Sequence, residues 1–215
     1  MTKRSALLLL GGTWHDFDGF AGTVIPLLAS QGWQVTTTYN PERLRFLVDD
    51  HIALVISYTC FSRREDQPQL PGPYRLSETQ LAALTNWVHA GGALLALHAA
   101  TVLGESDAAL GALLGGVFVE HPPEHSFTVY PLYNTHPLTE GLSAFTVRDE
   151  LYFERCYPDV QIHWVAIDRG VAYPVVWSKT EGHGRVVHIA LGHSAAVWNL
   201  EAYRKLLLAA VSWLT

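Results

Sequence analysis

Three histidines in the sequence share one kind of position, at the end of an apolar run and beside small residues that permit a turn. They are His15, His98 and His193, and the apolar runs before them span residues 6–10, 93–97 and 185–191. If these runs are parallel strands, their carboxyl ends lie along one edge of a sheet, where open α/β sheets bind ligands. Imidazoles that meet there can transfer protons near neutral pH or bind a metal ion.

The stretch around His98 has the pattern of a strand that ends in a sharp turn. Residues 91–101 read GGALLALHAAT, and the apolar part is too short for a helix, so we expect a fully buried parallel strand. Ala99 and Ala100 then permit the strand-to-helix elbow on which α/β-hydrolases present a nucleophile. Because a histidine stands there, we do not expect a serine or cysteine nucleophile. A core histidine bonded to a backbone carbonyl is the alternative.

Asp149 and Glu150 are the carboxylates best placed to assist these histidines. Residues 146–153 alternate in polarity and are expected to form one strand, in which neighbouring side chains point to opposite faces. At most one of the two acids should therefore reach the histidines, unless a bulge intervenes. A surface pair balanced by Arg148 and Arg155 is the alternative.

Asp16 is adjacent to His15 and is expected to orient its imidazole. The three histidines could also be the ligands of a catalytic zinc ion, with water in the fourth position. None of these three histidines belongs to a closely spaced pair such as H-x-x-x-H that would support this reading. We therefore predict no cofactor and keep a divalent metal such as zinc, bound by His15, His98 and His193, as the alternative.

The elements that must position these residues alternate between strand and helix in the first half of the chain. Strands are expected at residues 6–10, 33–39, 52–58 and 93–97, and helices at 20–30, 44–50 and 103–114 and from a capping box at Ser77 and Gln80 to Gly91. The charged and proline-containing residues 62–74 are expected to form a loop over the site or a disordered tip. The second half has further strands at 127–133, 146–153, 162–167, 173–177 and 185–191, and a last helix capped by Asn199. This order predicts an α/β fold, a doubly wound and mostly parallel sheet with a β-rich insertion in the second half.

The composition fits a single domain over residues 1–215, with 49% hydrophobic and 16% charged residues. The net charge of -6 is scattered and leaves no basic stripe, which argues against nucleic-acid binding. No apolar run approaches the length of a membrane span, and the first one is too short for a signal peptide. Two cysteines cannot form a disulfide framework, so we expect a cytoplasmic protein.

Five segments in this order resemble the ThuA-like family, linked to trehalose utilisation and to the class I glutamine amidotransferase-like superfamily. They read GGTWHDF (11–17), WVHAGGALLALHAAT (87–101), HPLTEGL (136–142), RDELYF (148–153) and GRVVHIALGH (184–193), and they extend over almost the whole chain. The resemblance implies a flavodoxin-like sheet flanked by helices. His98 occupies the position of the amidotransferase cysteine, so glutamine hydrolysis through a cysteine is not expected.

The resemblance also implies which polar residues form the site. By their match to the family segments they are His15, Asp16, His98, His136, Asp149, Glu150, Tyr152 and His193. We expect catalysis to involve His98, His193, His15, Glu150 and Asp149, and substrate binding to involve Trp14, Asp16, Tyr152 and His136. Trp14, Tyr152 and Trp198 could pack on sugar rings, with core packing as the alternative for each.

The function that follows is acid–base chemistry on a small sugar, either trehalose or a keto-disaccharide. A non-catalytic sugar-binding or regulatory module and a metal-dependent hydrolase are the alternatives. The expected partner is a small-molecule sugar, with neither nucleic acid nor membrane. The β-rich half offers an edge that a second copy of the chain could cover, so a homo-oligomer stays open.

Overall fold

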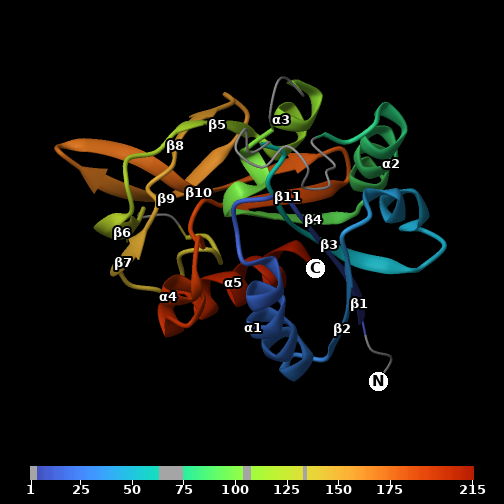
Figure 1. Ribbon diagram of the computed structural model, residues 1–215, viewed down its shortest axis with the longest axis horizontal. Helices are drawn as coiled ribbons and strands as arrows, with labels where there is room; N and C mark the ends of the chain where they lie inside the picture. The colour runs from blue at the N-terminus through green and yellow to red at the C-terminus, as the bar shows by residue number, and fades with distance from the viewer. Residues whose placement is uncertain (1–3, 63–74, 104–107, 133–134) are drawn as a thin grey trace.

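A computed structural model describes residues 4–62, 75–103, 108–132 and 135–215. Within these residues a nine-stranded mixed sheet crosses the molecule (Figure 1). Its strands lie in the order β2 (Trp33–Thr38), β1 (Arg4–Gly11), β3 (Ile52–Thr59), β4 (Ala93–Leu97), β11 (Gly184–Ile189), β10 (Val171–Glu181), β9 (Gln161–Asp168), β6 (His125–Pro131) and β7 (Phe145–Asp149). The expected α/β class is confirmed.

The parallel part of the sheet runs from β2 to β11, and β4 lies near its centre. Every residue of β4 is buried, because strands β3 and β11 flank it and helices cover both of its faces. An apolar run without alternation is typical of such a strand. Since these strands run in one direction, the chain leaves β1, β3, β4 and β11 at the same edge of the sheet.

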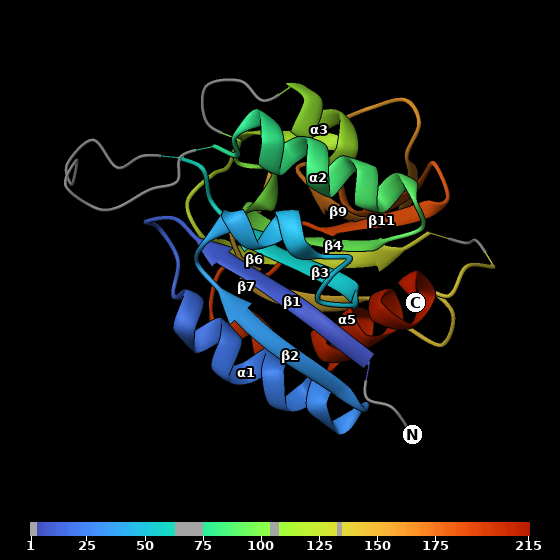
Figure 2. The same cartoon turned by 90° about the vertical axis from the view of Figure 1, so that its right-hand side faces the viewer.

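Helices cover the two faces of the parallel part, as Figure 2 shows. Helices α1 (Phe17–Ser30) and α5 (Glu201–Leu214) lie on one face, where Phe20 and Leu207 join a core with Leu8 and Leu95 of the strands. On the other face lie α2 (Glu78–His89), α3 (Ala108–Leu114) and the short helix η1 (Pro41–Phe46). Among the described residues no helix combines the length and the apolar character needed to cross a membrane.

The second half extends the main sheet with antiparallel strands. β10 pairs with β11 and β9, and β6 lies antiparallel between β9 and β7. The expected antiparallel strand at 127–133 is therefore present as β6, with Tyr133 outside the described residues. A separate two-stranded sheet joins β5 (Gly116–Glu120) and β8 (Phe153–Cys156).

The prediction of one strand over 146–153 is wrong. β7 ends at Asp149 and β8 begins at Phe153, and the two strands belong to different sheets. The chain turns here because the Asp149 carboxylate accepts a hydrogen bond from the backbone N–H of Glu150, at 3.0 Å, instead of pointing across a regular strand. Because the strand is interrupted here, the side chains of Asp149 and Glu150 need not point to opposite faces of a sheet.

Helix ends follow the expected signals in one case and not in another. The capping box at Ser77 and Gln80 begins α2, and Gly91 (φ +117°) follows its end. Asn199 does not cap the last helix: it ends the short helix α4 (Ala195–Trp198), and its Oδ1 accepts a hydrogen bond from Arg204 at 2.6 Å. Of the expected loop 62–74 and helix 103–114, residues 63–74 and 104–107 lie outside the described residues.

Candidate active site at the carboxyl edge of the sheet

His98 stands at an elbow between β4 and the short helix η2 (His98–Thr101). Its φ is +43°, a left-handed conformation that is rare for a residue other than glycine. Ala99 and Ala100 are fully buried behind it, so larger side chains would not fit there. The expected strand-to-helix turn is present. The left-handed backbone conformation of His98 costs roughly 1–3 kcal/mol, and strain of this kind is typical of functional sites.

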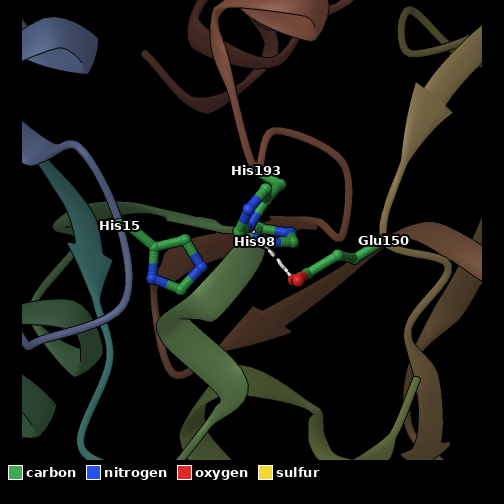
Figure 3. A group of neighbouring side chains, drawn as sticks. All are labelled: His15, His98, Glu150 and His193. Carbon is green, nitrogen blue, oxygen red and sulfur yellow. Dashed lines mark ion pairs between the residues drawn. The ribbon is translucent and has the colours of Figure 1, made fainter. Parts of the chain in front are cut away.

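The imidazoles of His15, His98 and His193 meet at this edge of the sheet (Figure 3). The ring centroid of His15 lies 5.0 Å from that of His98 and 5.0 Å from that of His193, and the last two are 5.6 Å apart. His15 reaches the site through a tight turn at Gly12, where a Cβ atom would lie 2.6 Å from the carbonyl oxygen of Cys60. Only glycine fits at that position.

The carboxylate of Glu150 lies between the histidines. Its Oε2 is 3.1 Å from Nδ1 of His193 and 3.4 Å from Nε2 of His98, while Oε1 is 3.7 Å from Nε2 of His121. Burial alone would raise the pKa of Glu150, but its bonds with His193 and His98 outweigh burial and hold that pKa well below its usual range. Glu150 is therefore an anion surrounded by imidazoles.

The tautomer of His98 follows from its second ring nitrogen. Nδ1 lies 2.7 Å from the carbonyl oxygen of Ala190, which can only accept a hydrogen bond, so Nδ1 carries the proton. In the neutral ring Nε2 then presents a lone pair toward Glu150. The carbonyl contact expected of a core histidine is present, and it fixes the orientation of a ring whose other nitrogen faces the site.

The pKa values of His15 and His193 shift in opposite directions. Neither ring nitrogen of His15 has a hydrogen-bond partner within the described parts of the chain. Burial and the neighbouring His98 and His193 lower the pKa of His15 to about 2, so its imidazole is neutral. The bond with Glu150 instead raises the pKa of His193 above its ordinary value, against the opposing effect of burial.

Asp149 holds the loop that carries His193 and does not face the histidine rings. Its Oδ2 accepts the backbone N–H of Gly192 at 2.8 Å, and Oδ1 accepts those of His193 and Glu150 at 3.0 Å each. The side chain is completely buried. Both adjacent acids thus serve the site, Glu150 directly and Asp149 through the backbone.

A cavity of about 240 Å³ opens beside the cluster. Tyr152 forms part of its wall and stacks on His98, with ring centroids 4.2 Å apart. Trp14 lies at the mouth and is 48% exposed. The residues lining the cavity are Trp14, His15, Cys60, Ser62, Val102, Phe118, His121, Glu150, Tyr152 and His193.

Three residues expected in the site have other roles. Asp16 does not orient His15: it caps α1, and its Oδ1 accepts the backbone N–H of Gly19 at 2.9 Å. His136 stacks on His163, with centroids 4.0 Å apart, and does not line the cavity. Trp198 is buried and donates its indole N–H to the carbonyl of Gly192, so it packs in the core instead of offering a face to a sugar.

Other residues at the site were not expected. Tyr58 donates its hydroxyl to the carbonyl of Gly192 at 3.0 Å, and Cys60 lines the cavity. Both lie at the carboxyl end of β3. The expectation that ligands bind at the carboxyl ends of parallel strands, which indicated the histidines, could therefore have indicated these two residues as well. His121 had no such signal, because it follows β5, which lies outside the main sheet.

A buried pair lies under the elbow. His188 of β11 and Glu154 of β8 are both fully buried, with Nε2 and Oε1 3.3 Å apart. Glu154 also accepts a hydrogen bond from the hydroxyl of Thr101, whose other contact is the carbonyl of His98 at 3.4 Å. The pair therefore supports the helix η2 that follows His98.

Comparison with known proteins identifies relatives of the chain. A sequence model of the family ThuA, described as trehalose utilisation, matches residues 11–214. No curated protein is significantly similar to the chain in sequence.

Solved structures share the fold at low sequence identity. A putative ThuA-like protein from Parabacteroides merdae is 18% identical with a TM-score of 0.81, over 99% of this chain and 90% of that one. One from Bacteroides uniformis is 17% identical with a TM-score of 0.75, over 98% and 91%. A β-galactosidase from Rahnella sp. R3 matches all of this chain with 32% of its own length, at 16% identity and a TM-score of 0.69.

Proposed function

Because the chain belongs to the ThuA family of trehalose utilisation, we propose that it is an enzyme acting on a small carbohydrate, either trehalose or a keto-disaccharide. The observation that carries this proposal is the carboxylate of Glu150, held within 3.4 Å of both His98 and His193 beside a cavity. Such a group is suited to acid–base catalysis at a sugar hydroxyl or carbonyl. The same proposal makes the fold a variant of the glutamine amidotransferase-like sheet without amidotransferase activity, since His98 stands at the elbow.

The roles of the residues follow from their protonation. His15 is neutral, and its pKa of about 2 makes it a weak base, so it binds the substrate through hydrogen bonds of its two unpartnered ring nitrogens. The His193–Glu150 pair takes up the proton from the substrate and returns the same proton to the product, because the carboxylate raises the pKa of His193, and His98 adjoins the pair through Nε2. Asp149 is a positioning residue, because it acts through the backbone of His193.

The cavity sets the size of the ligand. Its volume of about 240 Å³ is below the roughly 300–1,000 Å³ of pockets that enclose drug-sized ligands, so one sugar ring enters and the rest of a disaccharide extends outward. Trp14 at the mouth offers an exposed aromatic face for the outer ring. Tyr152 forms the wall beside the inner ring.

The same proposal places the protein in the cytoplasm. Cys60 and Cys156 are both unpaired, which suits a reducing compartment.

The test is a thermal-shift screen of sugars and keto-sugars, followed by product analysis of every stabilising compound. Glu150→Gln and His193→Ala should abolish turnover in folded protein. His183→Ala, an exposed histidine in the turn between β10 and β11, is the matched control and should leave turnover unchanged. Stabilisation without any product would favour a sugar-binding module, and full activity of both site variants would overturn the proposal.

A further inference from the structure

We infer that Nε2 of His98, Nδ1 of His193 and Oε2 of Glu150 bind one divalent transition-metal ion, with His15 beside the open face of that ion. The four side chains point to one centre from separate segments of the chain (Figure 3), and each offers a donor atom within 4.8 Å of the others. The inference deepens the function proposed for this cluster. Binding of the ion can nevertheless be measured without any sugar.

The first argument is the orientation of the donor atoms. Nδ1–H of His98 donates a hydrogen bond to the carbonyl of Ala190, so in the neutral ring the lone pair on Nε2 faces the carboxylate of Glu150 at 3.4 Å. Two acceptors that face each other repel unless a proton or a metal ion lies between them. A metal ion satisfies both lone pairs, and the carbonyl contact is the outer-shell bond that usually orients a metal-bound histidine.

The second argument is distance. Ligands bound tetrahedrally at about 2.0–2.1 Å lie about 3.3–3.4 Å from one another. Oε2 of Glu150 is 3.4 Å from Nε2 of His98 and 3.1 Å from Nδ1 of His193, so the two edges that meet at Glu150 already have nearly that length. The ion would be bound with only small side-chain movements.

The third argument is charge. Glu150 is a carboxylate, and the described residues that line its cavity include no lysine or arginine. Within the described parts of the chain, the ion-pairing partners of the Glu150 carboxylate are therefore the imidazoles of His98, His193 and His121. Several imidazolium ions at this spacing would repel one another, whereas a single divalent ion neutralises the carboxylate and uses the neutral rings as ligands.

The donor set indicates the kind of ion. Two imidazoles and one carboxylate are the protein ligands of some catalytic zinc sites and of non-haem iron sites. Calcium and magnesium prefer sites made only of oxygen atoms. With the ion in place it would polarise a sugar oxygen or a water, and His15 would stay free to form a hydrogen bond with the substrate.

The experiment uses the full chain after dialysis against a chelator. Zn²⁺ or Co²⁺ is added, the bound metal is counted by elemental analysis and the affinity is measured by calorimetry. We expect one ion per chain and a rise in melting temperature with added metal. With Co²⁺ we expect visible absorption bands of a four- or five-coordinate ion.

Variants assign the ligands. Glu150→Gln and His193→Ala should weaken binding by more than the roughly 10–100-fold typical of outer-shell changes. His15→Ala and His121→Ala are the matched controls and should each retain one ion per chain. Circular dichroism of the metal-free variants shows whether each one folds. The site would be overturned if metal-free wild type binds less than one added ion per chain, or if Glu150→Gln binds the ion as well as wild type. Loss of the ion in His15→Ala would overturn the three-ligand assignment.

The two proposals fail in different ways. One bound ion without turnover of any sugar overturns the proposed function and leaves the metal site. Turnover of a sugar by protein that binds no added Zn²⁺ or Co²⁺ leaves the function and overturns the metal site.

Discussion

Oδ1 of Asp149 accepts the backbone N–H of His193 at 3.0 Å, although the two residues are 44 positions apart in the chain. Asp149 ends β7 in the antiparallel part of the sheet, and His193 follows β11 in the parallel part. This bond connects the two halves of the sheet at the candidate site. It also turns the chain so that Glu150, the next residue, reaches the histidines.

Asp149→Asn should disrupt this connection. An amide can accept through only one of its two polar atoms, so the N–H of Gly192 or of His193 loses its acceptor in a buried place. The expected loss of stability is about 1–3 kcal/mol, measured by urea unfolding. Displacement of His193 should also lower kcat on any identified substrate by about tenfold, equal to about 1.4 kcal/mol. Unchanged stability would show that the Asp149 bonds are not needed to hold the loop.

Gly12→Ala should damage the turn that carries His15. At Gly12 φ is +131°, and an added Cβ would lie 2.6 Å from the carbonyl oxygen of Cys60. We expect a loss of about 1–3 kcal/mol in stability and a displaced imidazole. Gly22→Ala is the control: it lies in α1 with open space around it, so it should be neutral or stabilise by about 0.5–1 kcal/mol. Equal melting temperatures for the two variants would contradict the prediction.

Much of the parallel part of the fold could be predicted from the sequence. The apolar runs before His15, His98 and His193 are strands, as expected. They could be recognised because a parallel strand that is covered on both faces has a continuous apolar sequence. The meeting of the three imidazoles then followed from the shared direction of β1, β4 and β11.

What could not be predicted depends on contacts that are distant in sequence. Alternation over 146–153 suggested one strand, but the side-chain bonds of Asp149 end β7 and place Glu150 among the histidines. Asp16 was expected to orient His15 because it is the next residue, yet it caps the helix that follows. Local spacing does not distinguish a helix cap from a partner of a catalytic residue, and only the folded chain shows which backbone groups need an acceptor.

The stability of the protein should fall in mild acid partly because of His163. Burial, and to a smaller extent the nearby His136, lower the pKa of His163 to about 4. Nε2 of His163 lies 2.7 Å from the hydroxyl oxygen of Ser178. The folded state therefore binds fewer protons than the unfolded state below pH 6.5. As pH falls from there toward 4, this residue should cost up to about 1.4 kcal/mol per pH unit.

His163→Gln tests this, because glutamine can bond Ser178 but does not titrate. The variant should lose less stability than wild type between pH 6.5 and 4.5, as measured by urea unfolding. His183→Ala, on the surface, should follow the wild-type curve. Parallel curves for wild type and His163→Gln would show that His163 does not contribute to acid sensitivity.

The buried pair of His188 and Glu154 should be sensitive to the loss of either partner. Both side chains are fully buried, so among the described residues His188→Leu leaves the carboxylate of Glu154 with the hydroxyl of Thr101 as its one remaining side-chain partner. Breaking a buried pair in this way typically costs about 3–5 kcal/mol. Replacing both residues, with Glu154→Leu added, removes the unpaired charge as well. The double variant should therefore be more stable than His188→Leu, although η2 loses its contact through Thr101. A double-mutant cycle by urea unfolding measures the coupling, and additive effects of the two substitutions would show that the two side chains do not interact.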